Sequence, residues 1–224
     1  MKKIINFNTE EEFTKYLFSK VVQKLGEGSE GACYRGRDGL AYKELISGPK
    51  LGFPKQNYNL NDIITTSDIN NNSFAFPQVL FAINDELVGC TSNLVSKNYI
   101  DATDLLNNGI DEVDFDALID AYYIMIEDAI KLSNEGIAIY DLTFNLMFDG
   151  ERLIGVDTCG YYKTNKDIKK HNINCVNYAI KDQFRDCMLD NYDFDIDDEN
   201  SNIVSLLRKI KHEFQFKNKI KKYY

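Results

Sequence analysis

The clearest hydrophobic pattern in this chain runs from 114 to 133, where apolar residues recur at intervals of three or four. This period predicts an α-helix with one buried face. A shorter helix is predicted over 9–18, because Thr9 followed by Glu12 is typical of a capping box. The chain after residue 163 has weaker helical patterning, and its last, basic stretch, 208–224, is interpreted as turn-rich.

Apolar and polar residues alternate in several short runs of the first half, as is typical of strands with one buried face. Asp38-Gly39 and Asn84-Asp85 each separate two such runs and favour tight hairpin turns, since these residue types tolerate the positive φ that such turns require. The intervening segment 47–72 is rich in Gly, Pro, Asn and Asp, and 60–64 is a candidate helix within it. The five predicted strands are Val21–Leu25, Ala32–Gly36, Ala41–Lys43, Phe76–Ile83 and Glu86–Ser92.

A second group of short strands follows the long helix. The apolar run Ile137–Tyr140 leads into Asp141, and the runs Leu146–Phe148 and Leu153–Val156 are joined by the turn-forming pair Asp149-Gly150. Because most of the strands are predicted in the first half of the chain and most of the helical patterning in the second, we expect an α+β fold.

Composition and charge narrow the class of protein. At 224 residues, with 44% hydrophobic and 27% charged residues, the chain has an ordinary globular composition. A formal net charge of −9 argues against a chain-wide nucleic-acid surface, and no segment reaches the ~20 apolar residues of a membrane span. The five cysteines are scattered and lack C-x-x-C pairing, so we expect a cytoplasmic protein without a disulfide framework or zinc cage.

A glycine-rich motif, Gly26-Glu27-Gly28-Ser29-Glu30-Gly31, joins the first two predicted strands, and Lys43 lies on the third. In a dinucleotide-binding fold these glycines would open a helix instead. Alternation places Ala41 and Lys43 on the same strand face, where an inward lysine is costly unless it meets an anion. The hairpin and the lysine together predict a phosphate-binding cleft.

The second half supplies the polar residues that phosphoryl transfer needs. Asp141 and Asn145 follow the predicted long helix in one loop, and Asp157 ends the strand after the next hairpin. A carboxylate is needed to orient the attacking hydroxyl, while an amide oxygen and a second carboxylate suit magnesium.

In the order of these motifs the sequence resembles the protein-kinase-like superfamily, in a compact form, over residues 20–163. The resemblance implies a single bilobal domain, with a small antiparallel β-sheet N-lobe over about 1–95 and a mainly helical C-lobe over about 96–224. The part after about 163 diverges from the family.

The resemblance also implies a role for each matching residue, with ATP and Mg²⁺ as ligands. The catalytic positions are Asp141, which orients the acceptor, and Lys43, which contacts the α and β phosphates. Asn145 and Asp157 match the metal-binding positions. The nucleotide-binding positions are Gly26, Gly28, Ser29, Gly31, Ala41, Lys43, Asn93 and Val95, the last two in the hinge that follows the fifth strand.

The sequence departs from the family at four points. Ile139-Tyr140-Asp141 stands where the family has H-R-D, and Asn145 follows Asp141 after four residues instead of five. No A-P-E sequence follows Asp157, and no glutamate lies between Glu44 and Glu86 to pair with Lys43. Asp62 or Asp68 would have to take that role.

We therefore expect a MgATP-dependent phosphotransferase acting on a hydroxyl acceptor, with a protein Ser/Thr side chain preferred over a small molecule. One alternative is a pseudokinase or nucleotide-binding interaction module, motivated by the short loop after Asp141. A third is a kinase-like enzyme that transfers AMP from a nucleotide bound in the reverse orientation. No membrane or nucleic-acid partner is expected.

Overall fold

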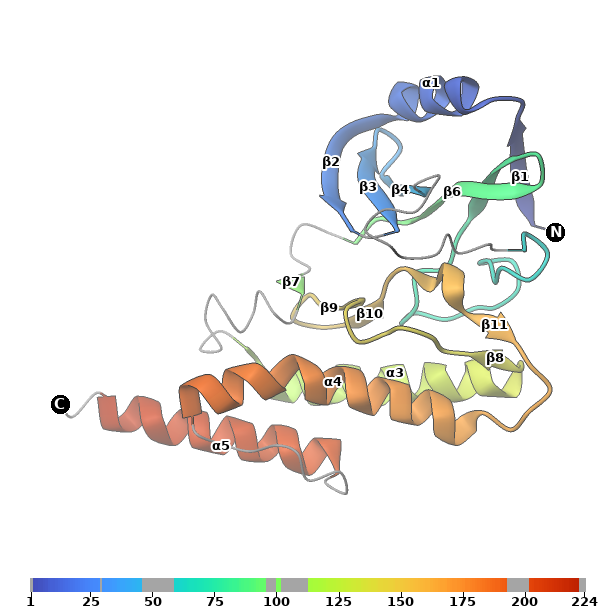
Figure 1. The fold of residues 1–224 in the computed structure, drawn as a ribbon. Helices are drawn as coiled ribbons and strands as arrows, with labels where there is room; N and C mark the ends of the chain where they lie inside the picture. The colour runs from blue at the N-terminus through green and yellow to red at the C-terminus, as the bar shows by residue number, and fades with distance from the viewer. Residues whose placement is uncertain are drawn as a thin grey trace. The chain divides into compact units, whose positions relative to one another are not determined.

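A computed structural model (Figure 1) describes residues 2–28, 30–45, 59–95, 100–101, 113–192 and 202–221. The chain divides into two compact units. Unit 1 consists of 1–95 and 157–165, and unit 2 consists of 96–156 and 166–224. The fold is α+β, because unit 1 is built on a sheet and unit 2 mainly on helices.

Unit 1 contains a six-stranded sheet in the order β1-β5-β6-β4-β3-β2. Its strands are β1 (Lys3–Phe7), β2 (Val21–Glu27), β3 (Gly31–Gly36), β4 (Leu40–Leu45), β5 (Val79–Ile83) and β6 (Glu86–Asn93). The five predicted strands are all confirmed, and they pair with one another in the antiparallel direction. The prediction of an antiparallel sheet is nevertheless wrong, since β1 adds to β5 in the parallel direction and makes the sheet mixed.

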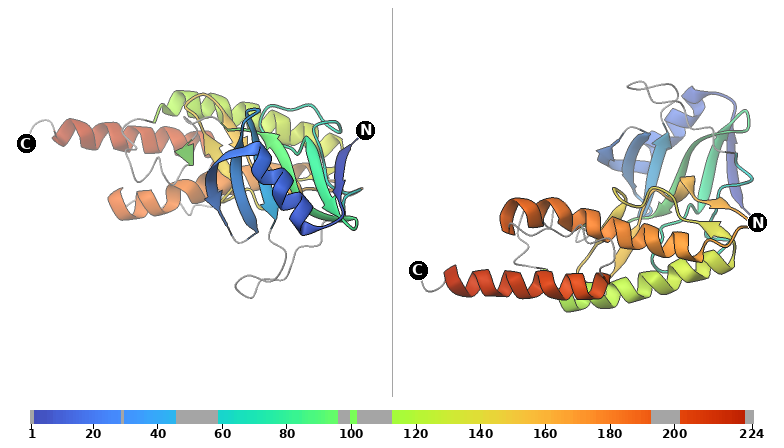
Figure 2. Two further views of the ribbon diagram at one scale, coloured as in Figure 1. Left: turned by 90° about the horizontal axis from the view of Figure 1, so that it is seen from above. Right: turned by 60° about the horizontal axis from the view of Figure 1, so that its bottom comes forward.

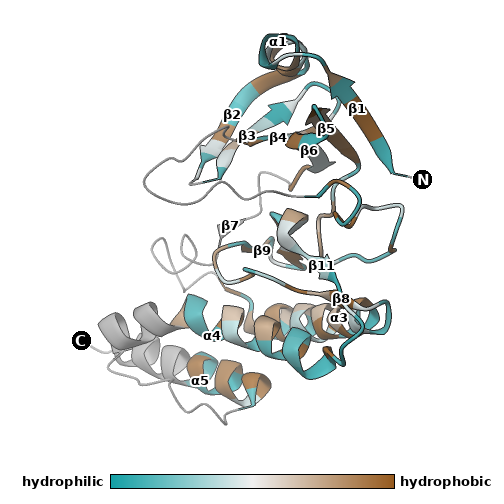
Figure 3. Ribbon diagram, turned by 45° about the vertical axis from the view of Figure 1, so that its right-hand side comes forward, coloured by the Kyte–Doolittle hydropathy of each residue, from teal (hydrophilic) through white to brown (hydrophobic). Residues whose placement is uncertain are grey.

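Helix α1 (Glu10–Lys20) covers one face of this sheet (Figure 2). It begins as predicted, with the Thr9 side chain accepting a hydrogen bond from the Glu12 amide. Phe13 and Leu17 from the helix pack with Tyr42 and Phe81 from the sheet into an aromatic-rich core. Strand β5, made entirely of apolar residues, is brown in Figure 3 and contributes to the cores on both faces.

In unit 1 the turn between β5 and β6 agrees with the prediction, whereas the segment 60–64 differs from it. Asn84 and Asp85 have φ angles of 50° and 63°, which fits the predicted tight turn between β5 and β6. The segment 60–64 forms turns, so the candidate helix there is wrong. Its apolar residues Leu60 and Ile63 are nevertheless buried, against the sheet face that carries Lys43.

Unit 2 contains helices α3 (Phe115–Asn134), α4 (Lys169–Tyr192) and α5 (Ile203–Lys221). The predicted long helix is confirmed as α3, whose Met125, Ala129 and Leu132 side chains are fully buried. The interpretation of 208–224 as turn-rich is wrong, because α5 runs through it to Lys221. Its buried residues Ile203, Val204, Leu206, Leu207 and Ile210 recur at helical spacing.

The remaining short elements are β7 (Ile100–Asp101), β8 (Ile137–Ala138), β9 (Leu146–Phe148), β10 (Leu153–Gly155), the 3-10 turn η2 (Thr158–Gly160) and β11 (Tyr162–Lys163). In unit 2, β9 pairs with β10 as an antiparallel hairpin and β7 adds to β9. Gly150, with a φ of 97°, forms the predicted turn between β9 and β10. This hairpin joins the Asp141 loop to the segment that begins at Asp157.

Candidate nucleotide-binding and catalytic residues

Lys43 lies on β4, on the sheet face opposite α1. Its register partners are Cys33 on β3 and Cys90 on β6, so the lysine stands in the middle of the sheet. Ala41 shares this face, as predicted from alternation, whereas Tyr42 points to the α1 side. The Lys43 side chain is only 11% exposed, which means that its charge needs a partner.

Two carboxylates provide that partner. The Lys43 Nζ atom forms an ion pair with Asp157 Oδ1 and another, at 3.1 Å, with Glu30 Oε2. Burial, the largest single effect, acts to lower the pKa of Lys43, but the charge and hydrogen bond of Asp157 and the charge of Glu30 act together with other contributions to raise the pKa overall. Lys43 is therefore a permanent cation between two acidic side chains.

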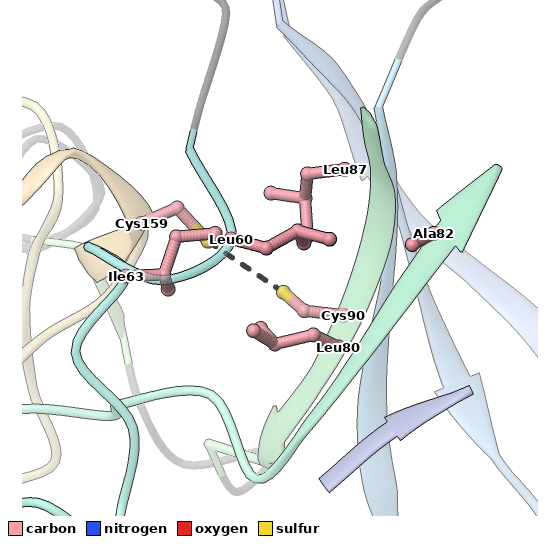
Figure 4. Close-up of a cluster of buried hydrophobic side chains, with 7 residues drawn as sticks. All are labelled: Leu60, Ile63, Leu80, Ala82, Leu87, Cys90 and Cys159. Atoms are coloured by element: carbon pink, nitrogen blue, oxygen red, sulfur yellow. Dashed lines mark hydrogen bonds between the residues drawn. The ribbon is translucent and has the colours of Figure 1, made fainter. Parts of the chain in front are cut away.

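Asp157 is held at this position by the residues that follow it. The Thr158 hydroxyl donates to the Ala75 carbonyl at 3.2 Å, and the Tyr161 ring packs edge-on against Phe76. The Cys159 and Cys90 sulfur atoms lie 3.7 Å apart in an apolar cluster drawn in Figure 4. Residues 158–161 thus fix the segment that carries Asp157 to the rest of unit 1.

Asp62 and Asp68 are not the partners of Lys43. Asp68 instead accepts hydrogen bonds from the Thr65 amide and hydroxyl at 2.8 and 3.0 Å. Burial acts to raise the pKa of Asp68, but these hydrogen bonds outweigh it and the pKa is lowered. Asp62 is exposed in the neighbouring turn. Their predicted role falls to Asp157 and to Glu30, which lies inside the glycine motif itself.

The glycines of the β2–β3 hairpin have different surroundings. A Cβ atom on Gly31 would lie 2.0 Å from the Glu44 carbonyl oxygen, so the close approach of β3 to β4 requires glycine there. A Cβ atom on Gly26 or Gly28 would meet nothing within 4 Å. Packing within the chain therefore explains Gly31 but not the other two. Ser29, the remaining predicted nucleotide contact in this hairpin, lies outside the described residues.

The predicted hinge residues lie at the end of β6. The Asn93 side chain is exposed and accepts a hydrogen bond from Gln78, while Val95 is half-buried. Both belong to unit 1, as do Ala41, Lys43 and the glycines. All the described residues predicted to bind the nucleotide therefore lie in one unit.

In unit 2 the loop from Asp141 to Asn145 is closed by its own polar groups. The Asn145 side-chain nitrogen donates to the Asp141 carbonyl at 2.7 Å, and its backbone amide donates to the Leu142 carbonyl at 3.0 Å. The Asn145 carbonyl accepts from the Val156 amide at 2.8 Å, which ties the loop to the end of the β9–β10 hairpin. The Asp141 side chain is exposed to solvent.

Helix α4 holds the strand that leads into this loop. Asn172, fully buried, accepts a hydrogen bond from the Ile139 amide at 2.9 Å and donates to the Ile137 carbonyl at 2.8 Å. It also donates to the Ser133 hydroxyl at 2.9 Å, so one side chain joins α3, β8 and α4. His171 lies in hydrogen-bonding contact with the Ile139 carbonyl at 3.0 Å. Sequence analysis missed Asn172, since an asparagine inside a helix carries no signal of such a role.

Asp141 and Asp157 share an uncommon backbone conformation. Their φ angles are 50° and 55°, in the left-handed region. Among the described non-glycine residues only the hairpin-turn pair Asn84 and Asp85 has positive φ as well. Such conformations cost free energy and concentrate at functional sites, although asparagine and aspartate tolerate them best.

The predicted metal ligands are chemically suited to magnesium. Asp157 offers a carboxylate, and Asn145 offers an amide oxygen because its amide nitrogen is committed to Asp141. Among the described residues, no group of three or more His, Cys, Asp or Glu side chains could hold a metal ion. Magnesium usually keeps several water or phosphate oxygens among its ligands, so Asp157 and Asn145 would each supply one oxygen of its coordination shell.

Within the described ranges, the helices are too short or too polar to span a membrane. Comparison with known proteins found no protein-family model that matches the chain and no curated protein similar to it.

Proposed function

We propose that this protein is a MgATP-dependent phosphotransferase of the bilobal protein-kinase-like type, with unit 1 as the main part of the N-lobe. The ion pair between Lys43 and Asp157 carries the proposal. The order of motifs predicts these two residues as site residues, and although they are 114 positions apart in the sequence, their side chains are in contact. An inward lysine paired with the carboxylate that is expected to bind metal is the arrangement that a triphosphate site needs.

The surroundings of the glycines support the same proposal. Gly26 and Gly28 are not required by contacts within the chain, so a close approach of the hairpin backbone to a ligand explains them better. In the proposed complex the hairpin amides and Lys43 bind the phosphates. Ala41 lies against the adenine ring, and the backbone from Asn93 to Val95 binds its edge.

In the proposed reaction the acceptor hydroxyl donates a hydrogen bond to the Asp141 carboxylate, which takes the proton as the oxygen attacks the γ-phosphorus. The bond from the γ-phosphorus to the bridging oxygen breaks, and ADP leaves. Asn145 and Asp157 would hold Mg²⁺, which when bound neutralises charge on the phosphates. The acceptor is proposed to be a protein Ser/Thr hydroxyl, and the site of action to be the cytoplasm.

A transfer assay with the Asp141→Asn variant tests the mechanism. The protein is incubated with MgATP, and ADP release and intact mass are followed, so that transfer to the protein itself or to an added acceptor protein is detected. We expect Asp141→Asn to reduce turnover by about 10³-fold, because a general base typically contributes 10²–10⁴-fold. Asp120→Asn, an exposed aspartate on α3, is the matched control. Equal turnover by wild type and Asp141→Asn would contradict the assigned mechanism.

Two alternatives remain as outcomes of the same experiment. The four-residue spacing from Asp141 to Asn145 favours a pseudokinase, because the Asn145 amide closes the shortened loop on itself. That function predicts Mg²⁺-dependent thermal stabilisation by ATP with no transfer and no ADP release. Transfer of AMP predicts the mass increase of an adenylyl group, with pyrophosphate released instead of ADP.

A further inference from the structure

Glu30 belongs to the glycine motif but does not point away into solvent. Its Oε2 atom lies 3.1 Å from Lys43 Nζ, and its side chain is 29% exposed. In the proposed function the amine of Lys43 holds a phosphate, and the hairpin that carries Glu30 covers the phosphates. The contact therefore puts a carboxylate where a phosphate oxygen would bind.

The three side chains joined by the described ion pairs carry a net negative charge. Lys43 contributes one positive charge, and Glu30 and Asp157 contribute one negative charge each. The nearby thiols of Cys33 and Cys90 stay protonated, since burial raises the pKa of Cys33, and the hydrogen bond to Cys159 together with burial raises that of Cys90. A polyphosphate that enters with Glu30 in place would meet net repulsion, which is strong at short range in a partly buried site.

Of the two carboxylates, Glu30 is the one that can leave. Asp157 is anchored by the Thr158 hydrogen bond and by the packing of Cys159 in the apolar cluster of Figure 4. Glu30 has a longer side chain than Asp157 and lies in the hairpin between β2 and β3. Rotation of its side chain would remove the carboxylate from Lys43 without any change in the sheet.

We propose that Glu30 occupies the phosphate position at Lys43 when no ligand is bound, and that a polyphosphate must displace it to bind. This inference rests on the proposed function in that the physiological ligand is taken to be a nucleotide. Glu30 thereby affects ligand selectivity: it weakens the binding of every ligand with a polyphosphate group and leaves the affinity for adenosine unchanged. Its role is to raise the threshold for occupancy rather than to orient Lys43.

The test measures dissociation constants by calorimetry for inorganic tripolyphosphate, ATP and adenosine, with magnesium present. Wild type is compared with Glu30→Gln and with the matched control Glu27→Gln, whose carboxylate in the same hairpin pairs with Lys24 instead. We expect Glu30→Gln to bind tripolyphosphate and ATP about 10-fold more tightly, and adenosine with an affinity within about twofold of wild type. Glu27→Gln is expected to stay within about twofold for all three ligands.

Weaker or unchanged tripolyphosphate binding by Glu30→Gln would overturn the inference, since it would mean that Glu30 orients Lys43 or plays no part. Absence of tripolyphosphate binding to both proteins would overturn it too. A thermal melt of each variant shows whether it is folded. If tripolyphosphate binding improves but ATP binds no better than tripolyphosphate, the proposed nucleotide function fails while the role of Glu30 stands. If ATP binds more tightly than tripolyphosphate but Glu30→Gln improves the binding of neither, the proposed role of Glu30 fails while the proposed nucleotide function stands.

Discussion

The polar side chains around Lys43 and those of the loop that follows Ile139 are held in place by different kinds of interaction. In unit 1, charged side chains are held by one another, with Lys43 between Glu30 and Asp157. In unit 2, the Asp141 loop is held by neutral amides, with Asn172 bound to the strand before it and Asn145 bound within it. One site is assembled by charge and the other by a neutral scaffold.

This difference has a consequence for mutations. Removing the charge of Lys43 leaves the carboxylates of Glu30 and Asp157 without the cation between them, so stability and ligand binding change together. The Asp141 carboxylate is exposed and the loop is closed by backbone and amide groups, so its charge can be removed without disturbing the scaffold. The scaffold itself depends on Asn172. The three predictions that follow test this contrast.

The largest effect on stability is expected from Asn172→Ala. The substitution leaves the Ile139 amide and the Ile137 carbonyl buried without their hydrogen-bond partner. Each such group costs about 1–3 kcal/mol, so we expect a loss of about 3 kcal/mol in the free energy of unfolding. Chemical denaturation measures it, with Asn174→Ala, an exposed asparagine on the same helix, as control. Similar losses for the two variants would show that the scaffold does not depend on Asn172.

For Lys43→Met we expect a smaller loss, about 2 kcal/mol, in the free energy of unfolding. Removing the lysine leaves two carboxylates facing each other, and their partial exposure to solvent limits the cost. Asp141→Asn is expected to change the free energy of unfolding by less than about 0.5 kcal/mol, as for an ordinary surface substitution. The same denaturation measurement compares the two. The contrast between the sites would be lost if Asp141→Asn were the more destabilising variant.

Much of the fold follows from local sequence. Five strands, α1 and α3 were predicted because alternation, helical spacing and turn residues are visible within short windows. The strand β1 is not predicted from the sequence. It pairs with β5, which lies far along the chain, and no local pattern in Lys3–Phe7 indicates that pairing. The interpretation of 208–224 as turn-rich is wrong because its many lysines are compatible with a helix, since lysine is a good helix former.

The candidate site could be predicted only in part, for a related reason. The spacing of motifs selected Lys43 and Asp157, whose side chains are in contact. The family order of motifs places the acidic partner of Lys43 after β4, where only Asp62 and Asp68 are candidates. Glu30 precedes Lys43 in the chain, so this order gives no indication of its contact with the lysine. Glu30 belongs to the glycine motif, and the sequence of that motif does not indicate that its side chain contacts Lys43.

The smallest effect on stability is expected from a tyrosine. Two tyrosines show the same contrast between a charged and a neutral hydrogen-bond partner. The Tyr34 hydroxyl donates to the Glu44 carboxylate at 3.0 Å in unit 1, and the Tyr122 hydroxyl donates to the Asn177 side-chain oxygen at 2.9 Å in unit 2. Burial raises the pKa of both, and the charge of Glu44 helps to raise that of Tyr34 to about 12.

Because the pKa of Tyr34 is higher in the folded than in the unfolded protein, its contribution to stability is fully present below about pH 10, the ordinary tyrosine value, and is lost as the pH rises towards about 12. Unfolding free energies are measured for wild type and Tyr34→Phe from about pH 9 to about pH 11. Wild type is expected to lose stability more steeply than Tyr34→Phe, while Tyr162→Phe, an exposed tyrosine in the same unit, follows wild type. Parallel curves for wild type and Tyr34→Phe would mean that the carboxylate of Glu44 does not act on this hydroxyl in solution.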